Sequence, residues 1–212
     1  MFAKLIAHQL RNPSGFIGRY VSRWMNQSNV AIYHAALELV VKSNRKKLLE
    51  IGFGGGGLLE MAVACGSFPK VSGVDSSLDM VKLVQRKLRR HVAQGKLEVQ
   101  HGGIGNLPFA PKAFDAVVSL NTIYFWPTLN TGVSECKRIL SDEGILVLGF
   151  DDKTEMSQWP GHRYGFKMYD VDEVREALEP FGFSEIGVRS GKTKKWGLFH
   201  CVHAKKGNSR DK

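Results

Sequence analysis

The chain has 212 residues, of which 43% are apolar and 24% are charged, a balance that is ordinary for a globular protein and excludes a disordered chain. Its net charge is unusual, because 30 Lys and Arg against 20 Asp and Glu leave +10. Residues 1–100 hold most of the excess, with 15 basic and 6 acidic side chains, which suggests nucleic acid or an anionic membrane surface as a partner of this half.

The sequence carries no pattern of membrane insertion, secretion or metal binding. No apolar run approaches the roughly 18 residues that span a bilayer, and residues 1–15 lack the apolar region and cleavage site of a signal peptide. Cys65, Cys136 and Cys201 form no Cys-x-x-Cys pair, and the 7 histidines form no His-x-x-x-His arrangement, which disfavours disulfides and a metal site. We therefore expect a cytoplasmic protein without a bound metal.

The N-terminal region predicts two helices, at residues 2–10 and 29–41, on either side of a break at Pro13, Ser14 and Gly15. Both segments precede the first strand-like run of the chain. We interpret residues 1–44 as a helical cap on a domain that begins near residue 45.

From residue 45 onward, short apolar runs alternate with amphipathic segments. Strands are expected at residues 47–51, 71–74, 97–99, 116–120 and 145–149, and helices at residues 58–64, 78–92 and 129–140. This alternation implies an α/β domain in which a parallel sheet is covered by helices on both faces. Ser76, with Asp79 three residues later, has the pattern of a capping box at a helix start.

The end of the chain departs from this alternation. A helix at residues 171–178, marked by a second capping-box pattern at Asp170, precedes strand-like runs at residues 184–188 and 197–204. The basic, turn-rich segment 189–195 lies between the two runs, so we expect an antiparallel hairpin that closes the sheet. Residues 206–212 are expected to form a disordered tail.

A glycine-rich loop separates the first strand from the following helix; its glycines are Gly52, Gly54, Gly55, Gly56 and Gly57. Glycine there lets backbone N–H groups approach a ligand, and the helix N-terminus adds a partial positive charge. Two spacings compete. One, from Gly52 to Gly57, is the G-x-G-x-x-G pattern of dinucleotide-binding proteins, which alone is weak evidence. The other starts at Glu50 and continues with a glycine at every second position.

The second spacing resembles motif I of the class I S-adenosylmethionine-dependent methyltransferases, and later motifs support the resemblance. GVDSS places the acid Asp75 after the second strand, where it can accept hydrogen bonds from ribose hydroxyls. LPFAPKAFDAVVS and ECKRILSDEGILVLGF are similar to the fourth strand, fourth helix and fifth strand of the methyltransferase type 11 group. The resemblance extends over about residues 48–205.

The resemblance implies a Rossmann-like fold, with a mostly parallel seven-stranded sheet and a C-terminal antiparallel hairpin. It also implies S-adenosylmethionine as the cofactor of a domain spanning residues 45–205, with the cap of residues 1–44 over the active site. Residues at the carboxyl ends of the strands are then expected to bind the cofactor: Glu50 at its methionine end, Gly52, Phe53 and Gly54 beneath it, Asp75 on the ribose hydroxyls, Ser76 and Met80 near the ribose and adenine, and Asn121 and Thr122 beside the methyl group.

One position departs from the family pattern. Gly103 stands where the group usually has an aspartate that accepts a hydrogen bond from the adenine amino group, so the adenine would rest on Ile104. Loss of this hydrogen bond is expected to weaken cofactor binding by about 0.5–1.5 kcal/mol. The departure keeps open a non-catalytic cofactor-binding or partner-binding module of the same fold. The glycine pattern alone also leaves a nicotinamide-dependent oxidoreductase as an alternative.

The sequence gives fewer indications of the residues that would bind the methyl acceptor. A general base is needed only when the acceptor must lose a proton, so no catalytic residue is assigned. Tyr124, His162 and Tyr164 are weak candidates, with His162 as the base, and packing is the alternative role for the neighbouring Trp126. The Asn-Pro-Pro-Tyr element of many methyltransferases that act on nucleic-acid amino groups is absent. We therefore expect a small-molecule or lipid head-group acceptor rather than nucleic acid.

The positions of the basic residues indicate which of them could contact an anionic partner or acceptor. Several of them lie opposite the apolar stripe of the predicted helix 78–92 and are interpreted as a solvated face. Arg11, Arg19 and Arg23 lie in the predicted cap, where they would border the pocket and favour an anionic acceptor. The sequence predicts neither the identity of the acceptor nor the oligomeric state.

Overall fold

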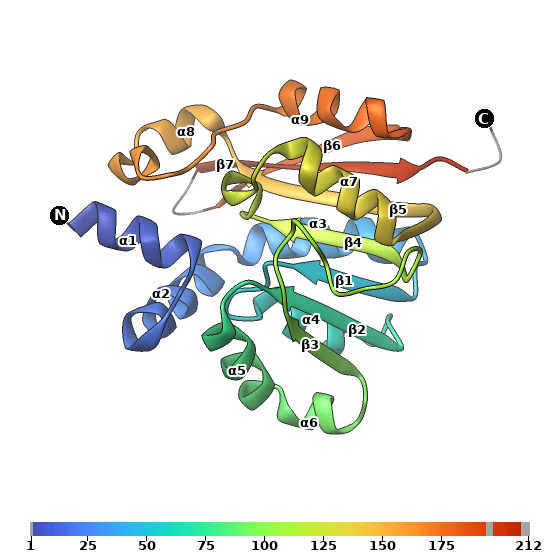
Figure 1. Cartoon of the computed structure of the whole chain (residues 1–212), viewed down its shortest axis with the longest axis horizontal. Coiled ribbons are helices and arrows are strands. Elements are labelled where there is room, and N and C mark those ends of the chain that lie inside the picture. Colours follow the sequence, from blue (N-terminus) through green and yellow to red (C-terminus); the bar gives the residue numbers. More distant parts are fainter. Residues whose placement is uncertain (1, 194–196, 209–212) are drawn as a thin grey trace.

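The structure is a computed structural model that describes residues 2–193 and 197–208. Within them, seven strands form one sheet in the order β3-β2-β1-β4-β5-β7-β6 (Figure 1). Strands β1 to β5 are parallel, whereas β7 is antiparallel to β5 and to β6. The predicted sheet and its hairpin are confirmed. The strands span Lys47–Ile51 (β1), Lys70–Asp75 (β2), Leu97–His101 (β3), Phe114–Leu120 (β4), Leu140–Asp151 (β5), Phe183–Thr193 (β6) and Gly197–Lys206 (β7).

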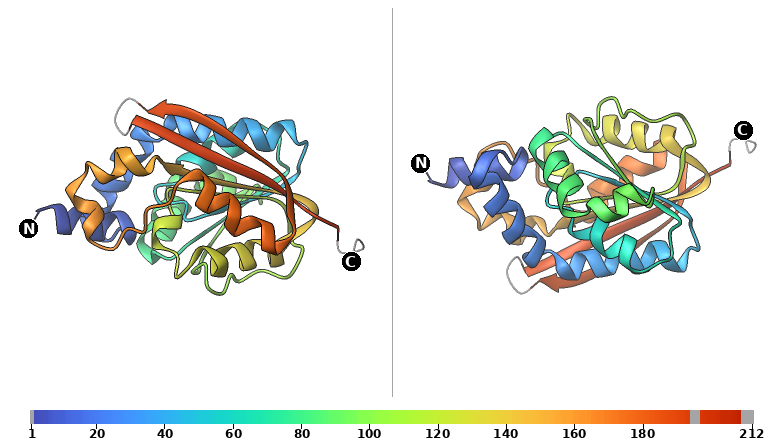
Figure 2. Two further views of the ribbon diagram at one scale, coloured as in Figure 1. Left: turned by 90° about the horizontal axis from the view of Figure 1, so that it is seen from above. Right: turned by 90° about the horizontal axis from the view of Figure 1, so that it is seen from below.

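Alternation of side chains along the strands builds a core on each face of the sheet. In β1, the buried Leu48 and Leu49 point to opposite faces and belong to different core clusters. Helices cover both faces, as predicted, and Figure 2 shows them on opposite sides of the strands. One face carries α3 (Val30–Lys42), α4 (Gly57–Ala64) and α5 (Leu78–Lys87), and the other carries α7 (Leu129–Ile139) and α9 (Val171–Leu178).

Two features of the predicted helix 78–92 differ in the structure. The segment consists of α5 and a short α6 (Arg89–Ala93), with Leu88 between them at φ −106° and ψ 25°. The N-cap of α5 is Ser77, one residue after the predicted Ser76, because the Ser77 hydroxyl accepts a hydrogen bond from the N–H of the third residue of the helix at 3.3 Å. The second predicted capping box, at Asp170, is confirmed at the start of α9.

The C-terminal hairpin is longer than predicted. β6 runs through Thr193, so most of the predicted turn 189–195 is strand, while residues 194 and 195 lie outside the described residues. β7 runs through Lys206, whose buried ammonium group donates to two backbone carbonyl oxygens, near the end of α7 and at the start of β5, at 2.8 and 2.5 Å. The strand thus includes the first residue of the predicted tail 206–212, of which residues 209–212 lie outside the described part.

The described N-terminal region contains three helices where two were predicted: α1 (Phe2–Arg11), α2 (Gly15–Ser28) and α3. Helix α2 is absent from the prediction. Helix α3 packs on the sheet, with Ile32, Ala36 and Val40 fully buried in its core. Only α1 and α2 lie beyond the end of the sheet (Figure 1), so these two helices are the covering part of the predicted cap 1–44.

The remaining elements are short. They are α8 (Lys153–Ser157) and three 3-10 turns, at Ile123–Phe125, Pro160–Arg163 and Glu179–Phe181. The turn Pro160–Arg163 contacts α1, so the segment that follows β5 lies beside the cap. No helix in the described part of the chain has both the length and the apolar character needed to cross a bilayer.

Candidate active site

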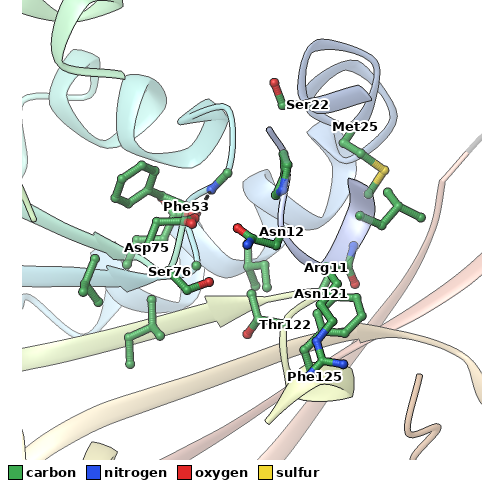
Figure 3. Close-up of a pocket in the computed structure, with 18 of the residues that line it drawn as sticks. Arg11, Asn12, Ser22, Met25, Phe53, Asp75, Ser76, Asn121, Thr122 and Phe125 are labelled. Atoms are coloured by element: carbon green, nitrogen blue, oxygen red, sulfur yellow. Dashed lines mark hydrogen bonds between the residues drawn. The ribbon is translucent and has the colours of Figure 1, made fainter. Parts of the chain in front are cut away.

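A cavity of about 420 Å³, here called the main cavity, lies at the carboxyl ends of β1, β2 and β4 (Figure 3). Open parallel α/β sheets bind ligands at this edge. The loops after these strands form one wall, and α1, α2 and the turn between them form the other. The lining brings together nearly all the predicted cofactor residues: Glu50, Gly52, Phe53, Gly54, Asp75, Ser76, Gly103, Ile104, Asn121 and Thr122. Met80 is the exception, because its side chain is fully buried in the core.

The glycine loop offers backbone rather than side chains to the main cavity. Gly54 has a φ of +49°, and a Cβ atom there would meet nothing within 4 Å, so this residue borders open space. Its N–H donates to Asp75 Oδ2 at 2.8 Å, which joins the loop after β1 to the end of β2. At Gly52, a Cβ atom would lie 2.3 Å from Thr122 Cγ2, so only glycine lets the loops after β1 and β4 approach this closely.

Two buried carboxylates line the main cavity. Asp75 accepts hydrogen bonds from the N–H groups of Gly54 and Ser77, both at 2.8 Å; burial raises the pKa of Asp75, and these two bonds oppose the rise. Glu50 is 3% exposed, and its Oε2 atom has no hydrogen-bond partner among the described residues. Burial, with a smaller contribution from Asp75, raises the pKa of Glu50 to about 8. A buried carboxylate that keeps one oxygen without a partner suits a cationic ligand group.

The cap contacts the glycine loop directly. Asn26 Nδ2, in α2, donates to the carbonyl oxygen of Gly55 at 2.9 Å, and the Tyr33 hydroxyl donates to Asn26 Oδ1 at 3.2 Å. A Cβ atom at Gly55 would lie 2.6 Å from Asn26 Nδ2. Glycine is therefore needed at this position for the approach of α2, a requirement that neither glycine spacing in the sequence indicates.

The turn between α1 and α2 is held at the start of α5. The Ser77 hydroxyl donates to the Pro13 carbonyl oxygen at 2.5 Å, and the Gly15 N–H donates to Asp79 Oδ2 at 2.8 Å. Together with Asn26, these bonds hold α1 and α2 beside the loops that follow β1 and β2.

The loop after β4 is organised by a buried tyrosine. Asn121 has a φ of +56°, a left-handed conformation that asparagine adopts more readily than most residues. The Tyr124 hydroxyl donates to Asn121 Oδ1 at 3.0 Å and accepts a hydrogen bond from the Asp151 N–H at 2.6 Å. Burial raises the pKa of Tyr124 well above its usual value. Tyr124 is thus placed to position its neighbours rather than to exchange a proton.

A second cavity of about 60 Å³, here called the side cavity, adjoins the main one at Asn121 and Phe125, which line both. Asp151, the last residue of β5, lines the side cavity and is 8% exposed, and its Oδ1 atom has no hydrogen-bond partner among the described residues. Burial raises the pKa of Asp151 to about 7. The sequence analysis missed this residue; the available signal is an acid directly after an apolar strand, which is also the placement of Asp75.

The other predicted acceptor-side residues lie elsewhere. His162 and Tyr164 line neither the main nor the side cavity, and His162 Nδ1 lies 2.6 Å from the Trp159 carbonyl oxygen. The structure therefore gives no support to His162 as a base. Trp126 lines the main cavity but is only 3% exposed, and its ring fills the space beside Gly132, which fits the alternative packing role.

The three arginines of the cap separate into two groups. Arg11 lines the main cavity, whereas Arg19 and Arg23 line a different groove of about 770 Å³, beside Lys87. Only Arg11 therefore borders the cavity as expected. Within the described ranges, no three His, Cys, Asp or Glu side chains gather as a metal site would require.

Comparison with known proteins shows that part of the sequence matches a protein family. Residues 49–148 match the family model described as "Methyltransferase domain". A demethylmenaquinone methyltransferase of Desulfitobacterium hafniense (strain Y51) is 31% identical over 111 residues, which cover 52% of this chain and 43% of that protein. The chain spans about half the length of the relatives it matches.

Solved structures agree with the sequence relatives. A chain of the complex between the Haloferax volcanii Trm112 methyltransferase activator and a methyltransferase superposes with a TM-score of 0.79 and 16% identity, covering 92% of this chain and 96% of that one. Geranyl diphosphate methyltransferase in complex with S-adenosylmethionine superposes with a TM-score of 0.71 and 15% identity, covering 94% of both chains. The family model thus identifies residues 49–148 as a methyltransferase domain, and the described chain has the fold of the methyltransferases with which it superposes.

Proposed function

We propose that the protein transfers a methyl group from S-adenosylmethionine to a small-molecule or lipid acceptor by in-line displacement. One observation carries this proposal: a cavity with the backbone and carboxylates expected for the cofactor adjoins a second cavity with mostly apolar walls. The two cavities supply separate places for a polar cofactor and an acceptor, and they meet at Asn121 and Phe125.

The residues of the main cavity fit the cofactor group by group. The unpaired Oε2 atom of Glu50 suits the ammonium group at the methionine end of the cofactor. Each oxygen of Asp75 accepts one backbone N–H and keeps a lone pair for a ribose hydroxyl. The backbone at Gly54 leaves open space beneath the ligand, and the Ile104 side chain offers an apolar surface for the adenine.

The cofactor, when bound, supplies a methyl group already activated by a sulfonium. The protein then has to align the acceptor with this group and keep water away, and alignment alone can contribute roughly 7–11 kcal/mol. The walls where the two cavities meet are suited to this task, because Leu10 and Met25 from the cap and Phe125 from the loop after β4 are apolar.

Cofactor binding is the direct test of the proposed function. Calorimetric titration with S-adenosylmethionine and S-adenosylhomocysteine is expected to give binding of both. Asp75→Ala should weaken this binding by about 1–3 kcal/mol, because two ribose hydroxyls lose a charged acceptor. Asp172→Ala, on the exposed surface of α9, is the control and should leave the affinity unchanged. Absence of binding of either ligand at millimolar concentration would contradict the proposal.

A gain of affinity is expected at Gly103. This residue lines the main cavity, and a Cβ atom there would meet nothing within 4 Å, so a side chain can be added without displacing the wall. Gly103→Asp should tighten S-adenosylmethionine binding by about 0.5–1.5 kcal/mol, since the carboxylate can accept a hydrogen bond from the adenine amino group. Gly105→Asp adds the same charge at another open position and should have a smaller effect. Equal affinities of the two variants would show that the added charge acts only at a distance.

The absent carboxylate at Gly103 is also the observation that favours the second candidate, a non-catalytic cofactor-binding module of the same fold. Transfer of labelled methyl from S-adenosylmethionine to any acceptor would exclude this candidate.

A further inference from the structure

Two residues that line the side cavity each carry a buried polar atom that has no hydrogen-bond partner among the described residues. These atoms are the carboxylate oxygen Oδ1 of Asp151, which is an acceptor, and the amide nitrogen Nδ2 of Asn121, which is a donor. Buried polar groups in native proteins are nearly always paired, so an unpaired acceptor and donor in the lining of one cavity point to a ligand group that pairs with both.

The hydroxyl group of Tyr124 connects the two residues that carry these atoms. Tyr124 donates its proton to Asn121 Oδ1 and accepts the backbone N–H of Asp151. Because the tyrosine proton requires an acceptor, the amide oxygen of Asn121 faces Tyr124, and the amide nitrogen is left for another partner. The Asn121 side chain and the Asp151 backbone are therefore joined through the Tyr124 hydroxyl.

The order of the strands places these atoms at the reacting end of the cofactor. Along the sheet, β2 ends at Asp75, β1 leads into the glycine loop, β4 leads to Asn121 and β5 ends at Asp151. A cofactor whose ribose lies on Asp75 and whose methionine part lies over the glycine loop points toward β4. The side cavity, over β4 and β5, is the next space along this edge.

Most of the remaining lining of the side cavity is apolar, and it comes from the cap and from the segment after β5. Phe166 packs against Tyr124 and Phe125, with ring centroids 5.8 and 4.7 Å apart. These walls suit an acceptor with an apolar body. They are Leu10, Met25, Phe125, Met156, Trp159 and Phe166.

The two unpaired atoms discriminate among the possible reacting groups. A hydroxyl can donate its proton to Asp151 and accept from Asn121, and its oxygen keeps a second lone pair for bond formation. An ammonium only donates and a carboxylate only accepts. A neutral amine has one lone pair, which it cannot share between the Asn121 donor and a methyl group.

We propose that the side cavity binds the hydroxyl group of a largely apolar acceptor between Asp151 and Asn121, and that the reaction is an O-methylation in which Asp151 receives the hydroxyl proton. This inference rests on the proposed methyltransferase function. The acceptor oxygen forms the bond to the methyl carbon, and the carbon–sulfur bond breaks with its electron pair remaining on sulfur. The proton passes to the Asp151 carboxylate, so the positive charge of the sulfonium and the negative charge of Asp151 are both removed.

The surroundings of Asp151 suit a proton acceptor. Burial raises its pKa to about 7, which makes it a stronger base than an ordinary carboxylate. Tyr124 is neutral, and Glu155, from α8, lines the same cavity. The adjacent Asp152 is engaged elsewhere, at 3.2 Å from His200 Nε2 of β7. The ionised form of Asp151 is the active one, so the rate of transfer should rise with pH through the region near 7.

Binding of matched small probes tests the subsite without knowledge of the natural acceptor. The protein is first saturated with S-adenosylhomocysteine and then titrated with p-cresol, p-toluidine and p-xylene, which share a shape and differ in one group. We expect p-cresol to bind about tenfold more tightly than the other two, because only its hydroxyl pairs with both atoms. Equal binding of p-cresol and p-xylene, or tighter binding of p-toluidine, overturns the proposal.

Two neighbouring substitutions test the role of Asp151. Asp151→Asn should reduce the p-cresol preference to less than about threefold and lower methyl transfer to p-cresol by about 10²–10⁴-fold, without the rise near pH 7. Asp152→Asn, the control, should keep both the preference and the pH profile. Equal rates in wild type and Asp151→Asn, or no transfer to p-cresol by wild type, overturn the assignment.

Calorimetry with S-adenosylmethionine separates this inference from the function on which it rests. Both variants and wild type should bind the cofactor alike, because neither Asp151 nor Asp152 lines the main cavity. If wild type fails to bind the cofactor, the methyltransferase function itself fails. If it binds the cofactor without preferring p-cresol, only the hydroxyl subsite fails.

Discussion

Glu50→Gln is expected to stabilise the ligand-free protein at high pH and to weaken cofactor binding at the same time. The pKa of Glu50 is raised from 4.5 to about 8, so between these values the folded protein holds a proton that the unfolded chain has released. Stability from this group is therefore present at low pH and is lost as the pH rises through 8. Glutamine does not ionise, so the variant should not lose this stability. Its free energy of unfolding should exceed that of wild type by about 3–5 kcal/mol at pH 9 and differ from it by less than about 1 kcal/mol at pH 5.

Urea unfolding at pH 5 and pH 9 measures the first effect, and calorimetry with S-adenosylmethionine at pH 9 measures the second. The affinity should fall by about tenfold or more, because the ammonium group of the ligand loses a charged partner. Glu60→Gln makes the same change on the exposed side of α4 and should alter stability by less than about 1 kcal/mol. A Glu50→Gln variant that is no more stable than wild type at pH 9 would show that the carboxylate is better solvated than the structure indicates.

Gly55→Ala is expected to displace the cap through a single methyl group. The added Cβ would lie 2.6 Å from Asn26 Nδ2, closer than side-chain atoms approach one another, so Asn26 must move and its hydrogen bond to the Gly55 carbonyl is lost. We expect a loss of about 1–3 kcal/mol in the free energy of unfolding, and weaker cofactor binding because α2 lines the main cavity. Gly105→Ala, at a position with open space, should cost less than about 1 kcal/mol.

A double-mutant cycle with Asn26→Ala isolates this contact. Asn26→Ala alone removes the bonds to Gly55 and Tyr33 and should cost about 1–2 kcal/mol. In that background the methyl group of Gly55→Ala has room, so the double variant should lose at least about 1 kcal/mol less than the sum of the single losses. Additive losses in urea unfolding would mean that the glycine loop and α2 do not depend on each other.

The elements that the sequence predicts well are those whose pattern is set by one local rule. The strands alternate with amphipathic helices, and the capping box at Asp170 depends on residues three positions apart, so both are readable along the chain. The break at Leu88 is different, because the helical spacing of apolar residues is the same on both sides of it. Helix α2 is missed because it begins at a glycine and its contacts with Gly55 and Asp79 come from distant parts of the chain.

The residues of the candidate site also fall into two groups, those that a local sequence motif predicts and those that it does not. Glu50, the glycine loop and Asp75 follow a spacing within one strand–helix–strand unit, so the motif alone locates them. Asp151 belongs to no such motif, and its unpaired carboxylate depends on the packing of α8, the cap and Tyr124 around it. His162 shows the reverse case, since a polar loop residue after β5 is a candidate from the sequence, whereas the linings of the two cavities do not include it.

The ionisable groups that line the two cavities are mainly acids, whereas the chain as a whole is basic. Among the described residues, four acids line the cavities, Glu50, Asp75, Asp151 and Glu155, against one base, Arg11, in a chain whose net charge is +10. Buried carboxylates act strongly on a nearby ligand charge and are little screened by salt. A sulfonium is positive, whereas the thioether left after methyl transfer is neutral. The cavities should therefore hold the loaded form of the cofactor more tightly than the spent one where these acids are ionised, and this difference in affinity should grow as the pH rises through the pKa values of Asp151 and Glu50, near 7 and 8.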